Sequence, residues 1–128
     1  MSKQRILHIE DTIECQQLVT AVLTHYGYEV FRADDGEQGV EMARTIQPDL
    51  ILMDLHLPGI DGLEAARLIK STPSLDSVPI IALTAADEAA DYQRALAAGC
   101  IAYLGKPFSP SELVALIHAH SEYVSART

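Results

Sequence analysis

The stretch LILMDLHLPGIDG, residues 50–62, predicts a buried strand that ends on an acidic side chain. Leu50–Met53 is an unbroken apolar run, which is typical of a parallel strand covered on both faces, and it stops at Asp54. Leu57-Pro58-Gly59 then predicts a tight turn, because proline presets one central dihedral and glycine accepts the positive φ that a type II turn requires next. Asp54 is therefore expected in a loop at a sheet edge, either as a functional acid or as an ordinary strand-end residue.

The composition indicates one globular domain with an acidic surface. The chain has 128 residues, 48% of them hydrophobic, and a formal net charge of −9. This length allows a hydrophobic core without disulfides or a structural metal. The charge argues against direct, non-specific binding to nucleic acid or anionic membranes, because no basic surplus is present to displace counterions. We find no signal-peptide pattern or membrane-spanning run, and expect a cytoplasmic protein without membrane insertion.

Strand-like and helix-like segments alternate along the chain. Short apolar segments predict five strands, at residues 6–9, 28–33, 50–53, 79–83 and 100–104. Three-and-four spacing of apolar residues predicts five helices, around residues 12–26, 39–47, 62–70, 87–98 and 110–120. This alternation requires a parallel sheet with helices on both faces, and the common five-strand solution has the order 2-1-3-4-5.

Several residues are assigned to the core by the same spacing. The inward face of the first helix is expected to comprise Cys15, Leu18, Val19, Val22, Leu23 and Tyr26. His8, in the first strand, should be a packed and hydrogen-bonded core residue. Cys15 and Cys100 fall in no zinc-ligand spacing, so both are interpreted as small buried hydrophobic residues. The last helix should begin with a capping box at Ser109-Pro110-Ser111-Glu112.

In the 2-1-3-4-5 order, the winding reverses between the first and third strands, and sites form at their carboxyl ends. Glu10 and Asp11 follow the first strand, so they should lie beside Asp54, with Thr84 and Lys106 nearby at the ends of the fourth and fifth strands. Neighbouring acids repel one another, so such a cluster is typical of a site that a lysine or a cation compensates. Oxygen ligands favour Mg²⁺, or Mn²⁺. Alternatively, the two acids only cap the first helix.

With a hydroxyl and an ammonium group added, this set of side chains suits phosphoryl transfer onto a carboxylate. In these residues the sequence resembles the receiver domains of two-component response regulators. The resemblance rests on Glu10-Asp11, Asp54, the LPGIDG loop, Thr84 and Lys106-Pro107 in matching order, and it covers essentially the whole chain. It implies an α/β, flavodoxin-like doubly wound fold with a five-stranded parallel sheet, order 2-1-3-4-5, and five helices.

The resemblance implies a phosphoacceptor and a metal site. Asp54 would accept the phosphoryl group from a phosphohistidine of a sensor histidine kinase or a histidine phosphotransfer protein in a phosphorelay. Asp11 would bind Mg²⁺ (or Mn²⁺) directly, Glu10 mainly through water, and Asp54 together with the backbone carbonyl of His56 would complete the protein ligands. His56 and Ala86 occupy positions that tune the hydrolysis rate in this family.

The resemblance also implies a switch. Lys106 would pair with the phosphoryl oxygens, Thr84 would move to hydrogen-bond to them, and Tyr103 would turn inward into the vacated space. The surface of the fourth helix, fifth strand and fifth helix would then change and control a downstream protein. A cis Lys106–Pro107 peptide bond is expected as well.

Two function classes remain open at this point. The first is a phosphorylation-controlled signalling module, a single receiver domain over residues 1–128 with no output domain, which is not an enzyme acting on separate substrates. A receiver excised from a hybrid histidine kinase or multidomain regulator would have the same features. The second is an aspartyl-phosphate hydrolase of the haloacid dehalogenase type, whose motif carries a second aspartate where this chain has His56.

Overall fold

The computed structural model describes residues 3–85 and 89–127, with side chains for residues 3–84 and 92–120. Its sheet has five parallel strands in the order β2-β1-β3-β4-β5. The strands are β1 (Arg5–Ile9), β2 (Glu29–Ala33), β3 (Leu50–Asp54), β4 (Ile80–Ala85) and β5 (Ala102–Lys106). The predicted α/β fold and strand order are confirmed.

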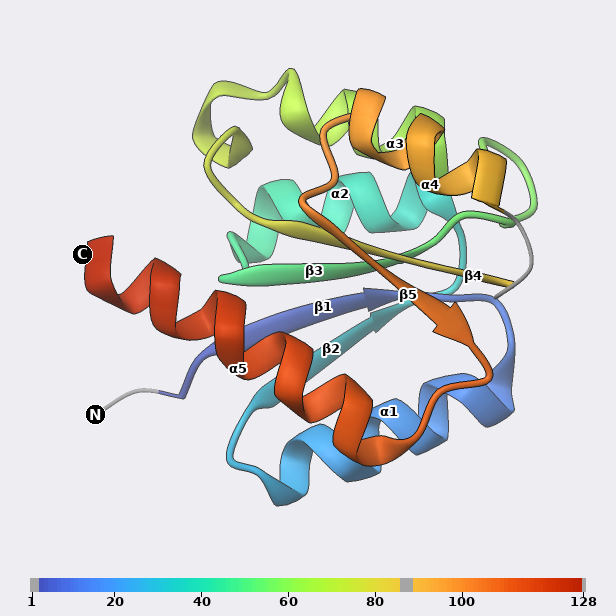
Figure 1. Cartoon of the computed structure of the whole chain (residues 1–128). Coiled ribbons are helices and arrows are strands. Elements are labelled where there is room, and N and C mark those ends of the chain that lie inside the picture. The colour runs from blue at the N-terminus through green and yellow to red at the C-terminus, as the bar shows by residue number, and fades with distance from the viewer. Residues whose placement is uncertain (1–2, 86–88, 128) are drawn as a thin grey trace.

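Helices cover both faces of this sheet (Figure 1). They are α1 (Ile13–His25), α2 (Gly36–Ile46), α3 (Gly62–Lys70), α4 (Ala89–Ala97) and α5 (Pro110–Arg127), with a short 3₁₀ turn, η1 (Pro73–Leu75). Helices α1 and α5 pack on one face, and α2, α3 and α4 pack on the other. No helix within the described residues combines the length and apolarity needed to cross a bilayer.

The central strand β3 is buried at every residue. Leu50 and Leu52 contribute to the apolar cluster beneath α1 and α5, whereas Ile51 and Met53 contribute to the cluster beneath α2, α3 and α4. Successive side chains of a strand point to opposite faces, so a strand with two covered faces has to be apolar throughout. This explains the apolar run that ends at Asp54.

Two helix starts fix the loops around the carboxyl edge of the sheet. The Oγ of Ser109 accepts the N–H of Glu112 (3.1 Å), and a Glu112 carboxylate oxygen accepts the N–H of Ser109 (2.9 Å). The predicted capping box is thus confirmed. Asp61 caps α3 by accepting the N–H of Glu64 (2.9 Å), which ends the LPGIDG loop. The Lys106–Pro107 peptide bond is cis, as expected.

Two details of the sequence prediction were wrong, and a third cannot be compared with the structure. Strand β5 runs from Ala102 to Lys106, so it begins and ends two residues later than the predicted segment. Leu18 on α1 and Tyr26, the residue directly after α1, are 45% and 54% exposed, so neither belongs to the buried face as predicted. Helix α4 is described from Ala89, and its predicted start at residue 87 lies outside the described residues.

Candidate functional site

The acids of the predicted site meet at the carboxyl edge of the sheet. Strands β1 and β3 are paired in register, with Ile9 opposite Met53, so Glu10 and Asp54 occupy the next step on neighbouring strands. Carboxylate oxygens of Glu10, Asp11 and Asp54 all lie within 4.8 Å of one another. Glu10 and Asp54 are buried, and Asp11 is exposed. The predicted convergence of these three acids is therefore confirmed.

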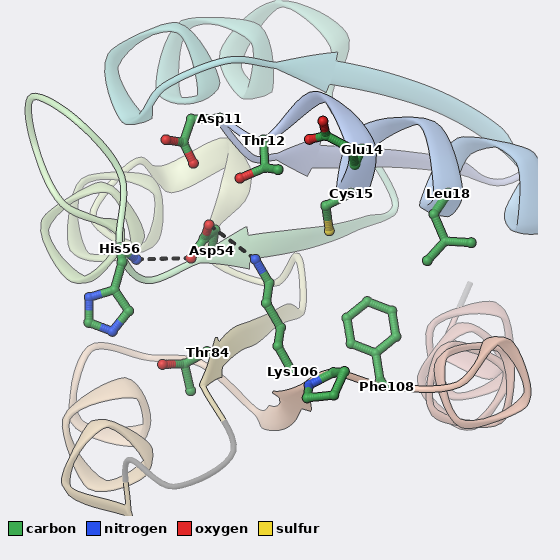
Figure 2. Close-up of a pocket in the computed structure, with 11 residues that line it drawn as sticks. Asp11, Thr12, Glu14, Cys15, Leu18, Asp54, His56, Thr84, Lys106 and Phe108 are labelled. Carbon is green, nitrogen blue, oxygen red and sulfur yellow. Dashed lines mark hydrogen bonds and ion pairs between the residues drawn. The ribbon is translucent and has the colours of Figure 1, made fainter.

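Lys106 compensates part of this negative charge. It stands at the end of β5, and its side chain extends across the end of β4 towards Asp54 (Figure 2). The Nζ atom donates to Oε1 of Glu10 (2.8 Å) and to Oδ2 of Asp54 (3.3 Å). Burial alone would lower the pKa of Lys106, but the hydrogen bond to Glu10 and the two carboxylate charges raise it above the usual value. The lysine is therefore held in its charged form between two buried acids.

The two buried carboxylates differ in how the site affects them. Burial, together with the charge of Glu10, raises the pKa of Asp54 to about 6. The hydrogen bond from the N–H of His56 and the charge of Lys106 act to lower this pKa but do not outweigh burial. For Glu10, burial also acts to raise the pKa, but the hydrogen bond and charge of Lys106 outweigh it and lower the pKa. Asp54 is thus the acid whose ionised form is least well compensated, so it gains most from an added cation.

The backbone around Asp54 is held tightly. The N–H of His56 donates to Oδ1 of Asp54 (3.0 Å), which fixes the carboxylate plane. The N–H of Gly62 donates to the carbonyl of Leu55 (3.2 Å), and a Cβ at Gly62 would overlap the Asp54 carbonyl oxygen and lie 2.6 Å from the Cα of Leu55. Gly59 has a φ of +74°, which confirms the predicted positive-φ residue after Pro58. Only glycine fits at position 62.

Gln16 holds the acid-bearing loop after β1, and the sequence analysis missed this role. Its side chain is buried on α1, and its amide donates to the backbone carbonyl of Glu10 and to Oδ1 of Asp34 (2.8 Å). Glu10 in turn accepts the N–H of Thr12 through Oε2 (3.2 Å), and Thr12 is the N-cap of α1, so neither acid occupies the capping position that was the alternative interpretation. A polar residue among apolar helix positions was the available signal.

The pocket at this edge has one acidic side and one apolar side (Figure 2). Asp54 and Lys106 lie at its centre, and Cys15, Leu18 and Phe108 form the apolar side. Cys15 is half-buried and lines the pocket, so the interpretation of this residue as an ordinary buried hydrophobe was wrong. Cys100 is buried as predicted. The apolar side was missed because helical spacing does not distinguish a core residue from one that borders a pocket.

The two predicted switch residues lie on neighbouring strands. Thr84 is buried within β4, pairs in register with Gly105 of β5, and lines the pocket. Tyr103 is half-buried on β5 and packs edge-to-face against Tyr92, with ring centroids 5.1 Å apart. Tyr103 thus has a packing role in this structure, and its switching role stays a prediction. Ala86 lies outside the described residues.

Comparison with known proteins assigns the family. The sequence model described as the response regulator receiver domain matches residues 6–118 of this chain. The chain belongs to this family.

Relatives of known name or structure agree with the assignment. The receiver domain is 37% identical over 117 residues to the DNA-binding response regulator MtrA of Mycolicibacterium paratuberculosis, covering 91% of this chain and 51% of MtrA. It is 39% identical to the receiver domain of the sensor histidine kinase PA1611 of Pseudomonas aeruginosa (TM-score 0.88, 94% and 99% of the two chains covered). A putative response regulator from Chloroflexus aurantiacus superposes with a TM-score of 0.91 at 31% identity, covering 94% and 99%.

The residues of this receiver domain suit the divalent ion that receiver domains generally bind in their acidic site. The PA1611 structure is described with magnesium coordinated in the active site cleft. In this chain Glu10, Asp11 and Asp54 present oxygen atoms within 4.8 Å of one another, and oxygen is the ligand that Mg²⁺ prefers. The carbonyl of His56 as a further ligand stays a prediction. The chain spans about half the length of the curated relatives it matches.

Proposed function

We propose that this receiver domain is a phosphorylation-controlled signalling switch. In this proposal Asp54 accepts a phosphoryl group from a phosphohistidine of a sensor histidine kinase or histidine phosphotransfer protein. The modified domain then changes the surface of α4, β5 and α5 and controls a partner protein. The observation that carries the proposal is the position of Lys106, whose ammonium lies 2.8 Å from Glu10 and 3.3 Å from Asp54, with the carboxylate of Asp11 beside them.

The transfer step assigns a task to each side chain. One carboxylate oxygen of Asp54 forms the new O–P bond as the N–P bond of the donor breaks, and the imidazole leaves with its electron pair. The N–H of His56 orients the carboxylate for this attack. Lys106 holds positive charge where the phosphoryl oxygens arrive, and Thr84 offers a hydroxyl donor. Glu10, Asp11 and Asp54 would hold Mg²⁺, which when bound neutralises charge that develops on the phosphoryl oxygens.

The switching step follows from the new charge. A phosphoryl group on Asp54 adds charge of about −1.5 to −2 at pH 7 and several strong acceptor oxygens. Lys106 and Thr84 are on β5 and β4, so their reorientation towards these oxygens shifts the ends of both strands. Tyr103, which packs against Tyr92 of α4, connects this movement to the surface of α4 and β5. A partner that binds this surface would then distinguish the two states.

The direct test is phosphorylation by a small donor. The protein is incubated with Mg²⁺ and acetyl phosphate, and its intact mass is followed with time. We expect one phosphoryl adduct per chain, suppressed by a chelator and absent in Asp54→Asn. Asp11→Asn should slow the reaction strongly. Glu14→Gln is the matched control, because Glu14 lines the same pocket but is not part of the acidic cluster, and it should react normally.

Two results would contradict the acceptor assignment. An adduct that persists in Asp54→Asn would place the phosphoryl group elsewhere. Steady release of many equivalents of phosphate from phosphomonoesters would support the aspartyl-phosphate hydrolase instead. In that class a general acid stands two residues after the nucleophile, and here this position holds His56, whose side chain is exposed. We therefore propose that the domain only phosphorylates and dephosphorylates itself.

A second candidate is that this receiver belongs to a longer regulator or a hybrid histidine kinase. The 39% identity to the PA1611 receiver, and the half-length match to MtrA, support this alternative as much as a single-domain protein. The assembly would determine whether the output is protein or DNA, and MtrA is described as DNA-binding. The predictions of no direct nucleic-acid contact and of a cytoplasmic location stay predictions. The length of the natural reading frame decides between the candidates.

A further inference from the structure

A second group of potential metal ligands adjoins the acidic cluster and shares Glu10 with it. Glu10 directly follows β1 and lies two residues after His8, so the two side chains point to the same face of the sheet, where Cys15 of α1 packs. Ligand atoms of these three residues all lie within 4.8 Å of one another. Imidazole, carboxylate and thiol therefore meet at one point.

His8 gives an independent indication that this point is a binding site. Its side chain is 0% exposed, and among the described residues neither ring nitrogen has a hydrogen-bond partner. The Nε2 atom is directed at Glu10 but lies 3.8 Å from its Oε1, too far for a hydrogen bond. This corrects the prediction of a hydrogen-bonded histidine. Buried polar groups are nearly always satisfied, so an imidazole with two unpaired nitrogens needs an explanation.

We propose that His8, Glu10 and Cys15 form a binding site for Zn²⁺ or a similar transition-metal ion, distinct from the Mg²⁺ site. Nitrogen, sulfur and oxygen together are ligands typical of zinc, whereas Mg²⁺ takes oxygen alone. Bonds of about 2.0–2.3 Å to a tetrahedral zinc ion would separate the ligand atoms by roughly 3.5 Å. The 3.8 Å between His8 and Glu10 is close to that value, so small side-chain movements complete the site. Cys15 lines the open pocket, which provides the route of entry.

Binding at this second site changes the first. The thiol of Cys15 releases its proton to solvent as the sulfur–metal bond forms, so the ion is held by two negative ligands and one neutral imidazole. Glu10 belongs to both groups of ligands, and Lys106 now occupies its Oε1 at 2.8 Å. A bound zinc ion must therefore displace Lys106 from Glu10 and compete with Mg²⁺. The expected result is inhibition of the Mg²⁺-dependent reaction by zinc.

The test uses Co²⁺ as a spectroscopic probe, and it does not depend on phosphorylation. Cobalt takes the same ligands as zinc and gives a thiolate-to-metal charge-transfer band in the near ultraviolet when sulfur is bound. We expect one Co²⁺ per chain with this band, its displacement by Zn²⁺, and a weaker apparent affinity when Mg²⁺ is added. Zn²⁺ affinity is measured in parallel by calorimetry.

Four variants separate the two sites. Cys15 is half-buried, so its position tolerates a smaller side chain, and Cys15→Ala should lose the charge-transfer band and bind Zn²⁺ at least about tenfold more weakly. His8→Asn should also bind Zn²⁺ at least about tenfold more weakly. Cys100→Ala should keep both. Asp11→Asn should weaken Mg²⁺ binding but keep the band, because Asp11 belongs only to the Mg²⁺ group. A charge-transfer band that persists in Cys15→Ala would overturn the proposal. So would Co²⁺ binding that shows no such band in the wild type and is abolished in Asp11→Asn.

Discussion

Replacing Asp54 with asparagine should raise the free energy of unfolding of the metal-free protein near neutral and alkaline pH. Asp54 is 5% exposed and shares its site with the buried carboxylate of Glu10. Asparagine has nearly the same shape, keeps an oxygen for the N–H of His56, and removes one negative charge. Lys106 keeps its 2.8 Å partner in Glu10, so no buried charge is left without compensation. The substitution therefore relieves repulsion without opening a cavity.

The magnitude follows from the pKa of Asp54. Burial and the charge of Glu10 raise this pKa from 3.8 to about 6. At about 1.4 kcal/mol per pKa unit, the ionised form costs the native state about 3 kcal/mol. Between the two pKa values the native carboxyl keeps a proton that the unfolded chain has lost, so the contribution of Asp54 to wild-type stability falls as pH rises through this window. The advantage of Asp54→Asn should be absent near pH 4, grow up to about pH 6 and remain constant above.

Urea denaturation of both proteins across this pH range, in the presence of a chelator, measures the effect. His8 is present in both proteins, so its own pH dependence cancels in the difference between them. Glu14→Gln removes an exposed carboxylate of the same pocket and should change stability by no more than about 0.5 kcal/mol. The urea m-values should agree, since the substitution does not alter the surface exposed on unfolding.

Magnesium should reduce the difference in stability between the two proteins. Mg²⁺ at about 100 times its Kd stabilises the wild type by about 2.7 kcal/mol, whereas Asp54→Asn has lost one ligand and gains less. An asparagine variant that is no more stable than the wild type at about pH 8 without metal would refute the repulsion argument. An equally large gain in the stability of Asp54→Asn at about pH 4 would also refute the repulsion argument, because native Asp54 is protonated at that pH and the substitution removes no charge.

Four other perturbations test the fold and the site. Lys106→Met should lower the free energy of unfolding, measured by urea denaturation, by about 3 kcal/mol, because two buried carboxylates lose their counter-charge. The phosphorylated variant should also fail to bind a partner that recognises the switched surface. Gly62→Ala should cost about 3 kcal/mol or more because its Cβ meets backbone, whereas Gly27→Ala, with a φ of +93° but open space, should cost about 1 to 2 kcal/mol. Burial lowers the pKa of His8 from 6.5 to about 4, so in this window only the unfolded chain takes up a proton. The contribution of His8 to the free energy of unfolding should therefore fall by about 3 kcal/mol between about pH 6.5 and pH 4, and the difference in stability between the wild type and His8→Met, measured across this range, should change by that amount. Ser109→Ala should cost about 1 kcal/mol and leave phosphorylation unchanged, as measured by the mass assay.

The sequence predicts the site best where backbone topology alone positions the residues. Glu10 and Asp54 follow apolar strands, so the strand order was enough to bring them together. The boundaries of β5 were less predictable. Gly99, with a φ of +105°, and Cys100, whose N–H donates to the carbonyl of Ala95, close the end of α4. Cys100 is apolar and buried. A residue of this kind fits the start of a strand as well as the end of a helix, so its type does not predict where β5 begins.

Helix α1 shows why spacing alone could not describe the pocket. Leu18 lies one turn after Cys15, and both border the pocket, although three-and-four spacing places them with the core. Gln16 interrupts that spacing but is buried, because its amide bridges the loops after β1 and β2. Which polar residue of a helix is buried depends on the loops it meets, and these loops come from distant parts of the chain. Pairwise contacts of this kind become visible only in the folded structure.

The crowding of charge that weakens the fold also supplies the driving force for ligand binding. Lys106 pairs with both Glu10 and Asp54, yet the pKa of Asp54 remains raised. A second cation relieves this repulsion, so part of the free energy lost in folding is recovered when the ion binds. The same reasoning links the two proposed metal sites: because Glu10 belongs to both, an ion at either site leaves the other with fewer ligands. Stability, Mg²⁺ affinity and zinc inhibition should therefore change together when Glu10 is replaced by glutamine.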